Sequence, residues 1–154
     1  MSYSVKLSEE LAVVATLDPY GLAGAATAYT DVVNMANHRR AIIAVLGGTA
    51  VATKMAATAV TIKVFECTAA GTAATTALKT KAIIRAQTSA ALGQQVVLEV
   101  RDNELGSVHA GYTQYFKVGV TAGTNAINVG VIVLAGGSRY SNAAAYDLAT
   151  VTIV

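Results

Sequence analysis

The chain of 154 residues is predicted to be an all-β protein, an antiparallel β-sandwich with jelly-roll topology. From about Thr58 to Leu134, short runs rich in Val, Ile and Thr alternate with breaks of Gly, Ala, Thr or Asn. Within the runs, successive side chains belong to opposite sides, and this period of two is typical of half-buried strands. Many short strands separated by frequent turn residues favour two packed antiparallel sheets.

The expected strands lie near residues 27–34, 40–46, 58–66, 79–87, 94–101, 112–121 and 126–135. In the run over 58–66, Val60, Ile62 and Val64 share one side of the strand, whereas Thr61, Lys63 and Phe65 share the other. Glycine breaks such as Gly47-Gly48 and Gly136-Gly137 predict turns. Residues 102–105 are expected to form one helical turn, and the Ala-rich stretches at 50–59 and 69–77 to form long loops.

The sandwich domain is assigned to residues 26–140, and an N-terminal segment over 1–25 precedes it. This segment is either an arm that reaches onto a neighbour or an edge strand packed on its own domain. Ser8 could cap a short helix, or Tyr3, Val5 and Leu7 could alternate as an edge strand. Asp18-Pro19-Tyr20-Gly21 predicts a turn, because Pro presets φ and Gly tolerates positive φ.

The C-terminal segment over 141–154 ends in an alternating apolar strand. Such a strand must pair with something, because an unpaired edge invites association. It either closes the sheet internally or adds to the sheet of a neighbour. From the two end segments and the domain exit we select these side chains as the expected partner-binding residues: Tyr3, Val5, Leu7, Pro19, Tyr20, Arg139, Tyr140 and Tyr146.

The composition favours assembly over a freely diffusing monomer. Hydrophobic residues make up 54% of the chain and charged residues 13%, compared with about 25% charged in a typical soluble domain. A net charge of +2, with one basic cluster at His38-Arg39-Arg40, argues against a nucleic-acid partner. We expect no membrane span and no secretory signal, and therefore synthesis in a host cytoplasm.

We expect no catalytic residues, no metal site and no cofactor. The single Cys67 is expected to be a small buried residue, and His38 and His109 lack carboxylates at metal-ligand spacing. The only concentrated group of acids is Glu66, Glu99, Asp102 and Glu104. A local ion pair between Glu99 and Arg101 is a simpler explanation for Glu99 than a pair of catalytic carboxylates. Tyr112, Tyr115 and Tyr140 are the plausible aromatic platform for a glycan.

Several segments together resemble the capsid decoration (cement, or head auxiliary) proteins of tailed bacteriophages. The segments are residues 29–49, Thr61–Thr72, Val96–Leu105, Tyr115–Thr121 and Gly136–Tyr140. The resemblance covers about residues 26–140 and leaves both ends unmatched. It implies a β-sandwich subunit that is commonly trimeric, sits at three-fold positions on the capsid and has no catalytic residues.

The leading hypothesis is therefore a structural protein on the virion capsid surface, with the major capsid protein and two further copies of itself as partners. One alternative is a virion-displayed β-sandwich that binds carbohydrate or the host surface. A second is a component of the tail or tube, since those too use β-sandwiches.

Overall fold

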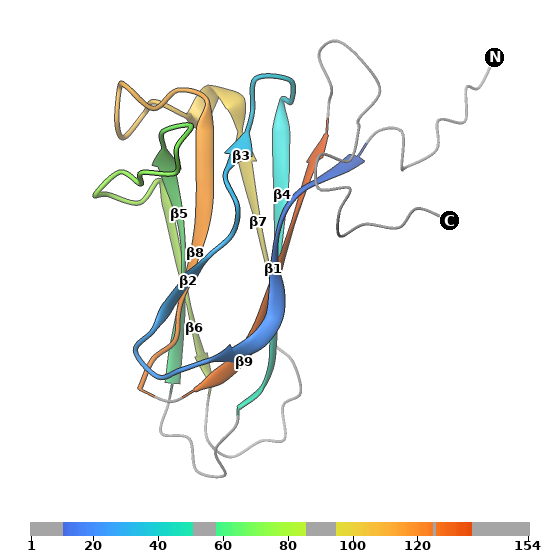
Figure 1. Cartoon of the computed structure of the whole chain (residues 1–154), viewed down its shortest axis with the longest axis vertical. Coiled ribbons are helices and arrows are strands. Elements are labelled where there is room, and N and C mark those ends of the chain that lie inside the picture. Colours follow the sequence, from blue (N-terminus) through green and yellow to red (C-terminus); the bar gives the residue numbers. More distant parts are fainter. Residues whose placement is uncertain (1–10, 51–57, 86–94, 125, 137–154) are drawn as a thin grey trace, which may run out of the picture.

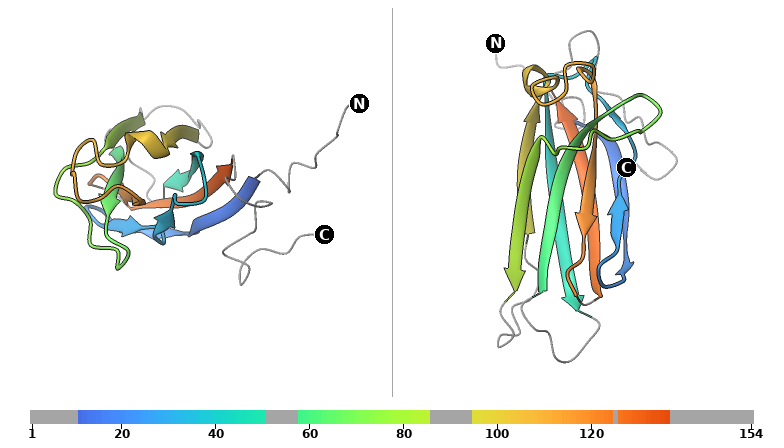
Figure 2. Two further views of the ribbon diagram at one scale, coloured as in Figure 1. Left: turned by 90° about the horizontal axis from the view of Figure 1, so that it is seen from above. Right: turned by 90° about the vertical axis from the view of Figure 1, so that its left-hand side faces the viewer.

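The computed structural model describes residues 11–50, 58–85, 95–124 and 126–136, and shows two antiparallel sheets packed as a sandwich (Figure 1). The strands run along the long axis of the molecule, and the view from above separates the two layers (Figure 2). The predicted all-β antiparallel sandwich is therefore confirmed.

The two sheets have the strand order of a jelly roll. One sheet contains, in spatial order, β1 (Leu11–Leu22), β9 (Ile127–Gly136), β4 (Arg40–Ala50) and β7 (Gln95–Arg101). The other contains β2 (Thr27–Tyr29), β8 (Tyr115–Thr121), β5 (Thr58–Cys67) and β6 (Lys79–Arg85), and the short β3 (Val33–Asn34) also pairs with β8. The chain crosses repeatedly between the sheets, which is how a jelly roll joins two Greek keys.

The expected strand over 27–34 is interrupted, and Thr30 bridges the interruption. Its backbone N–H donates to the carbonyl of Val118 at 2.9 Å, and its hydroxyl accepts from the amide of Val118 at 3.1 Å. Both backbone groups of Val118 therefore keep hydrogen-bond partners where regular pairing stops, as buried backbone groups require. Thr30 itself is buried. The helical turn expected over 102–105 is a 3-10 turn, η1 (Asp102–Glu104).

The core lies between the inner sides of the two sheets. Val60, Ile62 and Val64 are buried, whereas Thr61, Lys63 and Phe65 are partly exposed, as the alternation predicted. These inward side chains are fully buried: Ile43, Val100, Phe116, Val118 and Val133. β-branched residues dominate because they suit extended backbone and pack closely.

The sequence-based expectations for two turns were wrong, because both segments are bulges inside strands. Asp18–Gly21 lies within β1, where an extra residue separates the Leu17–Val131 pair from the Tyr20–Val129 pair. Pro19 is accepted there because edge strands and bulges tolerate a residue without an N–H. Gly47-Gly48 likewise lies within β4, next to a register shift between Gly47 and Ala50.

For residues 11–22 the structure decides between the arm and the edge strand. They form β1 and pair along β9, so the sandwich includes residues well before position 26. Residues 1–10, with the proposed Ser8 cap, and residues 137–154, with the alternating tail, lie outside the described residues.

Lys79 connects the two sheets at the side where β6 and β7 are the edge strands. Its ammonium donates to both carboxylate oxygens of Glu104, at 2.9 and 2.8 Å, and to the backbone carbonyl of Glu99. Burial alone would raise the pKa of Glu104, but the hydrogen bonds from Lys79 and the Arg101 amide, with the nearby positive charges, lower it. The ionised form of Glu104 therefore holds this contact.

Replacing Ile62 by Ala is expected to lower the free energy of unfolding by about 2–5 kcal/mol, because a fully buried side chain leaves a cavity. The matched variant Thr61→Ala, on the outer side of the same strand, should cost less than about 1 kcal/mol. Urea unfolding of both variants measures the difference. Equal losses would contradict the assignment of the two sides of β5.

Replacing Glu104 by Gln is expected to remove part of the pH dependence of stability. Because its folded pKa is lowered from 4.5, Glu104 contributes stability above that value, and this contribution is lost as pH falls through the lowered pKa. The stability difference between the two proteins should therefore be largest near pH 7 and shrink below about pH 4. Urea unfolding from pH 3 to 7 tests this, with Glu99→Gln, whose ion pair is exposed, as the control.

Candidate functional site

The outer side of the β1–β9–β4–β7 sheet is apolar along its two central strands, β4 and β9, whereas Glu99 on β7 and Thr16 on β1 lie opposite Ile42 and Ile132 in the same rows. Cross-strand pairing aligns the outward residues of the four strands in rows across the sheet. We call the following side chains the apolar face: Val13 on β1, Ile42, Ala44 and Leu46 on β4, Val97 on β7, and Ile132 and Leu134 on β9. Leu46 is 49% and Val97 66% exposed, so the face meets solvent in a single chain.

Charged residues lie at one end of the apolar face and at its β1 edge. At the end, Arg40 on β4 and Arg101 on β7 are direct cross-strand partners, and Arg101 also pairs with Glu99 at 3.0 Å. At the edge, the bulge of β1 lies level with Gly130 and carries the exposed Asp18. Pro19 of the same bulge lies over Gly130, where an added Cβ would be 3.1 Å from the Pro19 Cγ.

The outer side of the second sheet has the polar character of a solvated surface. Its outward positions include threonines on all four strands and Lys63, and the hydroxyls of Thr27 and Thr121 hydrogen-bond at 2.7 Å. An antiparallel sheet with one solvated side normally shows this pattern. The two outer sides of the same molecule therefore differ in kind.

Two aromatic side chains interrupt the polar surface of the second sheet. Tyr29 and Phe65 lie 6.2 Å apart between ring centroids, and both approach Gly119, where a Cβ would be 2.9 Å from Tyr29. The Lys117 ammonium sits 4.4 Å from the Tyr29 ring centroid and donates to the Gly71 carbonyl at 2.7 Å. These side chains contact one another in a local cluster, in which Tyr29 remains 46% exposed.

A buried carboxylate organises the loop between β7 and β8. Glu66, near the end of β5, is fully buried. Its carboxylate accepts hydrogen bonds from the backbone N–H groups of Gly106, Val108 and His109 at 3.0, 3.4 and 2.8 Å. Gly106 has a φ of +84°, and a Cβ there would lie 2.9 Å from the Thr113 methyl group. Glu66 is thus a structural acid that fixes the loop, a role which its position in the sequence did not reveal.

The loop presents a stacked pair of rings. His109 and Tyr112 are parallel within 13°, with centroids 4.3 Å apart, and His109 is exposed. The contact between His109 and Glu66 is made by the backbone amide, so it orients the loop and is not an acid–base pair. Of the expected glycan platform, Tyr112 stacks on His109, Tyr115 is half-buried on β8, and Tyr140 lies outside the described residues.

Two other titratable groups considered for chemistry are buried. Burial raises the pKa of the Cys67 thiol to about 11, although the charge of Lys117 opposes this, so the group is a neutral thiol at pH 7. Burial lowers the pKa of His38. The expected burial of Cys67 is confirmed, and His38 is buried as well. Within the described ranges, no three His, Cys, Asp or Glu side chains gather as a metal site, and no helix is long and apolar enough to cross a membrane.

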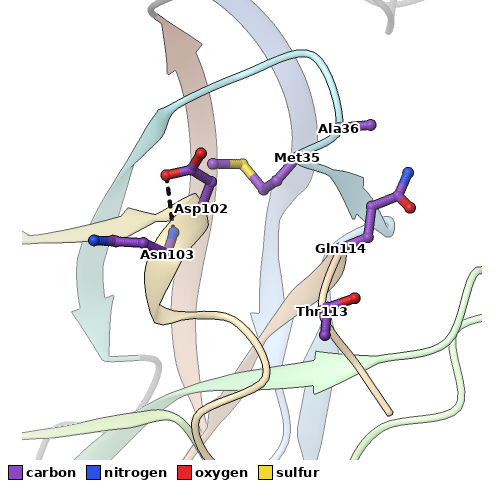
Figure 3. A pocket seen from close by; sticks show the side chains of 6 residues that line it. All are labelled: Met35, Ala36, Asp102, Asn103, Thr113 and Gln114. Atoms are coloured by element: carbon purple, nitrogen blue, oxygen red, sulfur yellow. Dashed lines mark hydrogen bonds between the residues drawn. The ribbon is translucent and has the colours of Figure 1, made fainter. Parts of the chain in front are cut away.

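An open pocket of about 440 Å³ lies beside η1 (Figure 3). Met35, Ala36, Asp102, Asn103, Thr113 and Gln114 line it. The Asp102 carboxylate accepts a hydrogen bond from the backbone N–H of Asn103 at 2.8 Å. The side-chain amide of Gln114 donates to the side-chain oxygen of Asn34 at 3.0 Å. None of these lining side chains is aromatic, so the pocket does not offer the stacking surface expected of a glycan site.

Of the expected partner-binding residues, Pro19 is the one whose side chain the structure describes. It is exposed at the border of the apolar face. Tyr20 follows it in β1 and pairs with Val129 through the backbone. The remaining residues lie outside the described part of the chain: Tyr3, Val5, Leu7, Arg139, Tyr140 and Tyr146. The apolar face was not expected from the sequence, although the alternation in β4 and β9 places its residues on the side opposite the core.

Comparison with known proteins supports the fold. No family model and no curated protein sequence matches the chain. A chain in the structure of infectious bursal disease virus, Gt strain, is similar with a TM-score of 0.52 and 13% identity, over 85% of this chain and 33% of the viral chain. A chain in the Gx strain structure is similar with a TM-score of 0.47 and 13% identity, over 88% and 37%. This protein therefore spans about a third of the viral chain, and the first likeness shows that the two share a fold.

Replacing Glu66 by Gln is expected to destabilise the protein by about 1–3 kcal/mol, because the new NH₂ group would face loop amides that are themselves donors. The amides of Gly106, Val108 and His109 should exchange faster with solvent. Hydrogen exchange at single-residue resolution measures this, and Glu99→Gln provides an exposed control. Unchanged exchange would contradict the structural role of Glu66.

Proposed function

We propose that this chain is a non-enzymatic structural protein of a virion, which decorates the capsid of a tailed phage and stabilises it. It binds the major capsid protein on the capsid surface as a homotrimer at three-fold positions. The jelly-roll fold, shared with a chain of a virus structure, is consistent with this role, and the resemblance of residues 26–140 to decoration proteins favours the phage capsid.

The apolar face is the observation that carries the proposal. Exposed apolar patches on soluble domains mark interaction sites, and this one extends along the two central strands of a sheet, β4 and β9. The fold also supplies rigidity. Backbone pairing joins the strands within each sheet, and the Lys79–Glu104 contact joins the two sheets where β6 and β7 are the edge strands. A rigid subunit with an apolar side can resist separation of the capsid subunits that it joins.

The physical benefit would come from repetition. Internal pressure from packaged DNA pushes capsid subunits apart, and each bound decoration subunit adds interface free energy that opposes this separation. Individually weak contacts become strong when three copies bind together, because the second and third contacts form at high effective concentration. The low charge of the chain, 13%, suits close contact with neighbouring subunits.

The test is binding of the purified full chain to expanded shells of the phage's major capsid protein that lack decoration. We expect the protein to sediment as a trimer, to occupy three-fold positions in a cryo-electron microscopy reconstruction, and to raise the temperature at which the shells open. Unexpanded shells, whose surface lattice differs, serve as the control. A protein that binds neither kind of shell would refute the proposal.

A further inference from the structure

We infer that the edges of both sheets are closed against strands of other copies of this chain, and that Lys79, Lys81 and Glu104 close the side where β6 and β7 lie. An edge strand presents unpaired backbone N–H and C=O groups, and a strand of another molecule can add to them. The inference concerns how copies are kept from joining strand to strand, and it does not rest on the proposed function.

The edges on the β1 and β2 side carry features that hinder strand addition. β1 contains two bulges, and Pro19 in the second bulge has no N–H to donate. In the other sheet, β2 and β3 are three and two residues long, and residues 30–32 separate them. Bulges, proline and very short strands are all means by which edge strands avoid pairing with another chain.

On the opposite side, β6 carries two lysines on the inner side of its sheet. Lys79 pairs with Val64 and Lys81 with Ile62 across β5, and both of these β5 side chains are fully buried. Lys81 is nevertheless exposed, and the Lys79 side chain is 30% exposed. Apolar residues at these positions would extend the core to an open apolar seam between the sheets. Lysines that point inward from an edge strand oppose joining there, because a partner would have to bury their charges.

Side chains also occupy backbone groups at the open edge of β7. The Lys79 ammonium donates to the Glu99 carbonyl, and the Glu104 carboxylate accepts from the Arg101 N–H at 2.9 Å. Alternate residues of a paired strand direct their backbone groups to the same edge, so these two groups mark the edge that β4 does not use. They are groups to which an added strand would have to bond.

The ion pair between Lys79 and Glu104 links these contacts. The Lys79 ammonium lies 2.9 and 2.8 Å from the two carboxylate oxygens of Glu104, and the pair spans from the edge of one sheet to the turn that follows β7 in the other. A strand that added to β7 would have to displace both side chains and break their ion pair as well. Contacts within the chain therefore close the β6–β7 side without any partner.

The first experiment removes the three closing side chains from the full chain. Lys79→Met, Lys81→Val and Glu104→Leu together free the two backbone groups of β7 and make the inner side of β6 apolar. Sedimentation velocity over a concentration series should show larger assemblies than those of the wild-type chain, with association at least about tenfold tighter. The control is Lys63→Met on the outer side of β5, which changes the net charge by the same amount and should sediment as the wild type does.

The second experiment distinguishes edge joining from unfolding. The N–H groups of Val97 and Glu99 are directed to the open edge of β7, so hydrogen exchange there should slow in the assemblies of the triple variant. Ile62→Ala, which is destabilised through the core instead, should not form such assemblies below its unfolding temperature. Assemblies in which the Val97 and Glu99 amides exchange as fast as in the wild type contradict the inference.

Two further outcomes would overturn the inference. One is a triple variant that sediments as the wild type does. If that variant does not fold, Lys81→Val decides in its place, because its position is exposed; it should associate several-fold more tightly than the wild type. The other is a wild-type oligomer in which the Val97 and Glu99 amides are already protected, since its copies would then join through β7. Neither experiment uses a capsid, so the result is independent of whether the chain binds shells.

Discussion

The structure depends on one constraint: each sheet must bury one side, and within the described part of the chain the inner sides of the two sheets bury each other. Alternating β-branched residues satisfy this constraint along β4, β5, β8 and β9, where the inward positions are almost all buried. Bulges in β1 and β4 adjust the strands locally without turning their apolar residues outward. The arrangement leaves two outer sides, and their chemistry is free to serve function.

Those two outer sides differ. One is lined with threonines and lysine and contains a local cluster of Tyr29, Phe65 and Lys117. The other is apolar along its central strands and carries Arg40 and Arg101 at one end. Exposed apolar surface is typical of interaction sites, so this side supports the proposed contact with capsid protein.

The loop end of the sandwich illustrates how a charged residue can be structural. Glu66 accepts hydrogen bonds from backbone amides of the β7–β8 loop, which replace the water that its side chain loses on burial. The same loop then holds the His109–Tyr112 stack in a fixed position. The sequence offered Glu66, Cys67 and His109 as candidates for chemistry. In the structure, Glu66 anchors a loop, Cys67 is a core residue and His109 presents an exposed ring.

The sequence by itself determined the fold class, six of the seven expected central strands and the burial of Val60, Ile62 and Val64, because a period of two is a local signal that survives in any β environment. Only the tertiary structure decided that Asp18–Gly21 and Gly47-Gly48 are bulges and that Leu11–Leu22 is an edge strand, since pairing with β9 overrides the local preferences of Pro and Gly. It alone also assembled the apolar face, whose residues come from four strands far apart in sequence. Local patterns show which side chains share a side of one strand, but not which strands become neighbours.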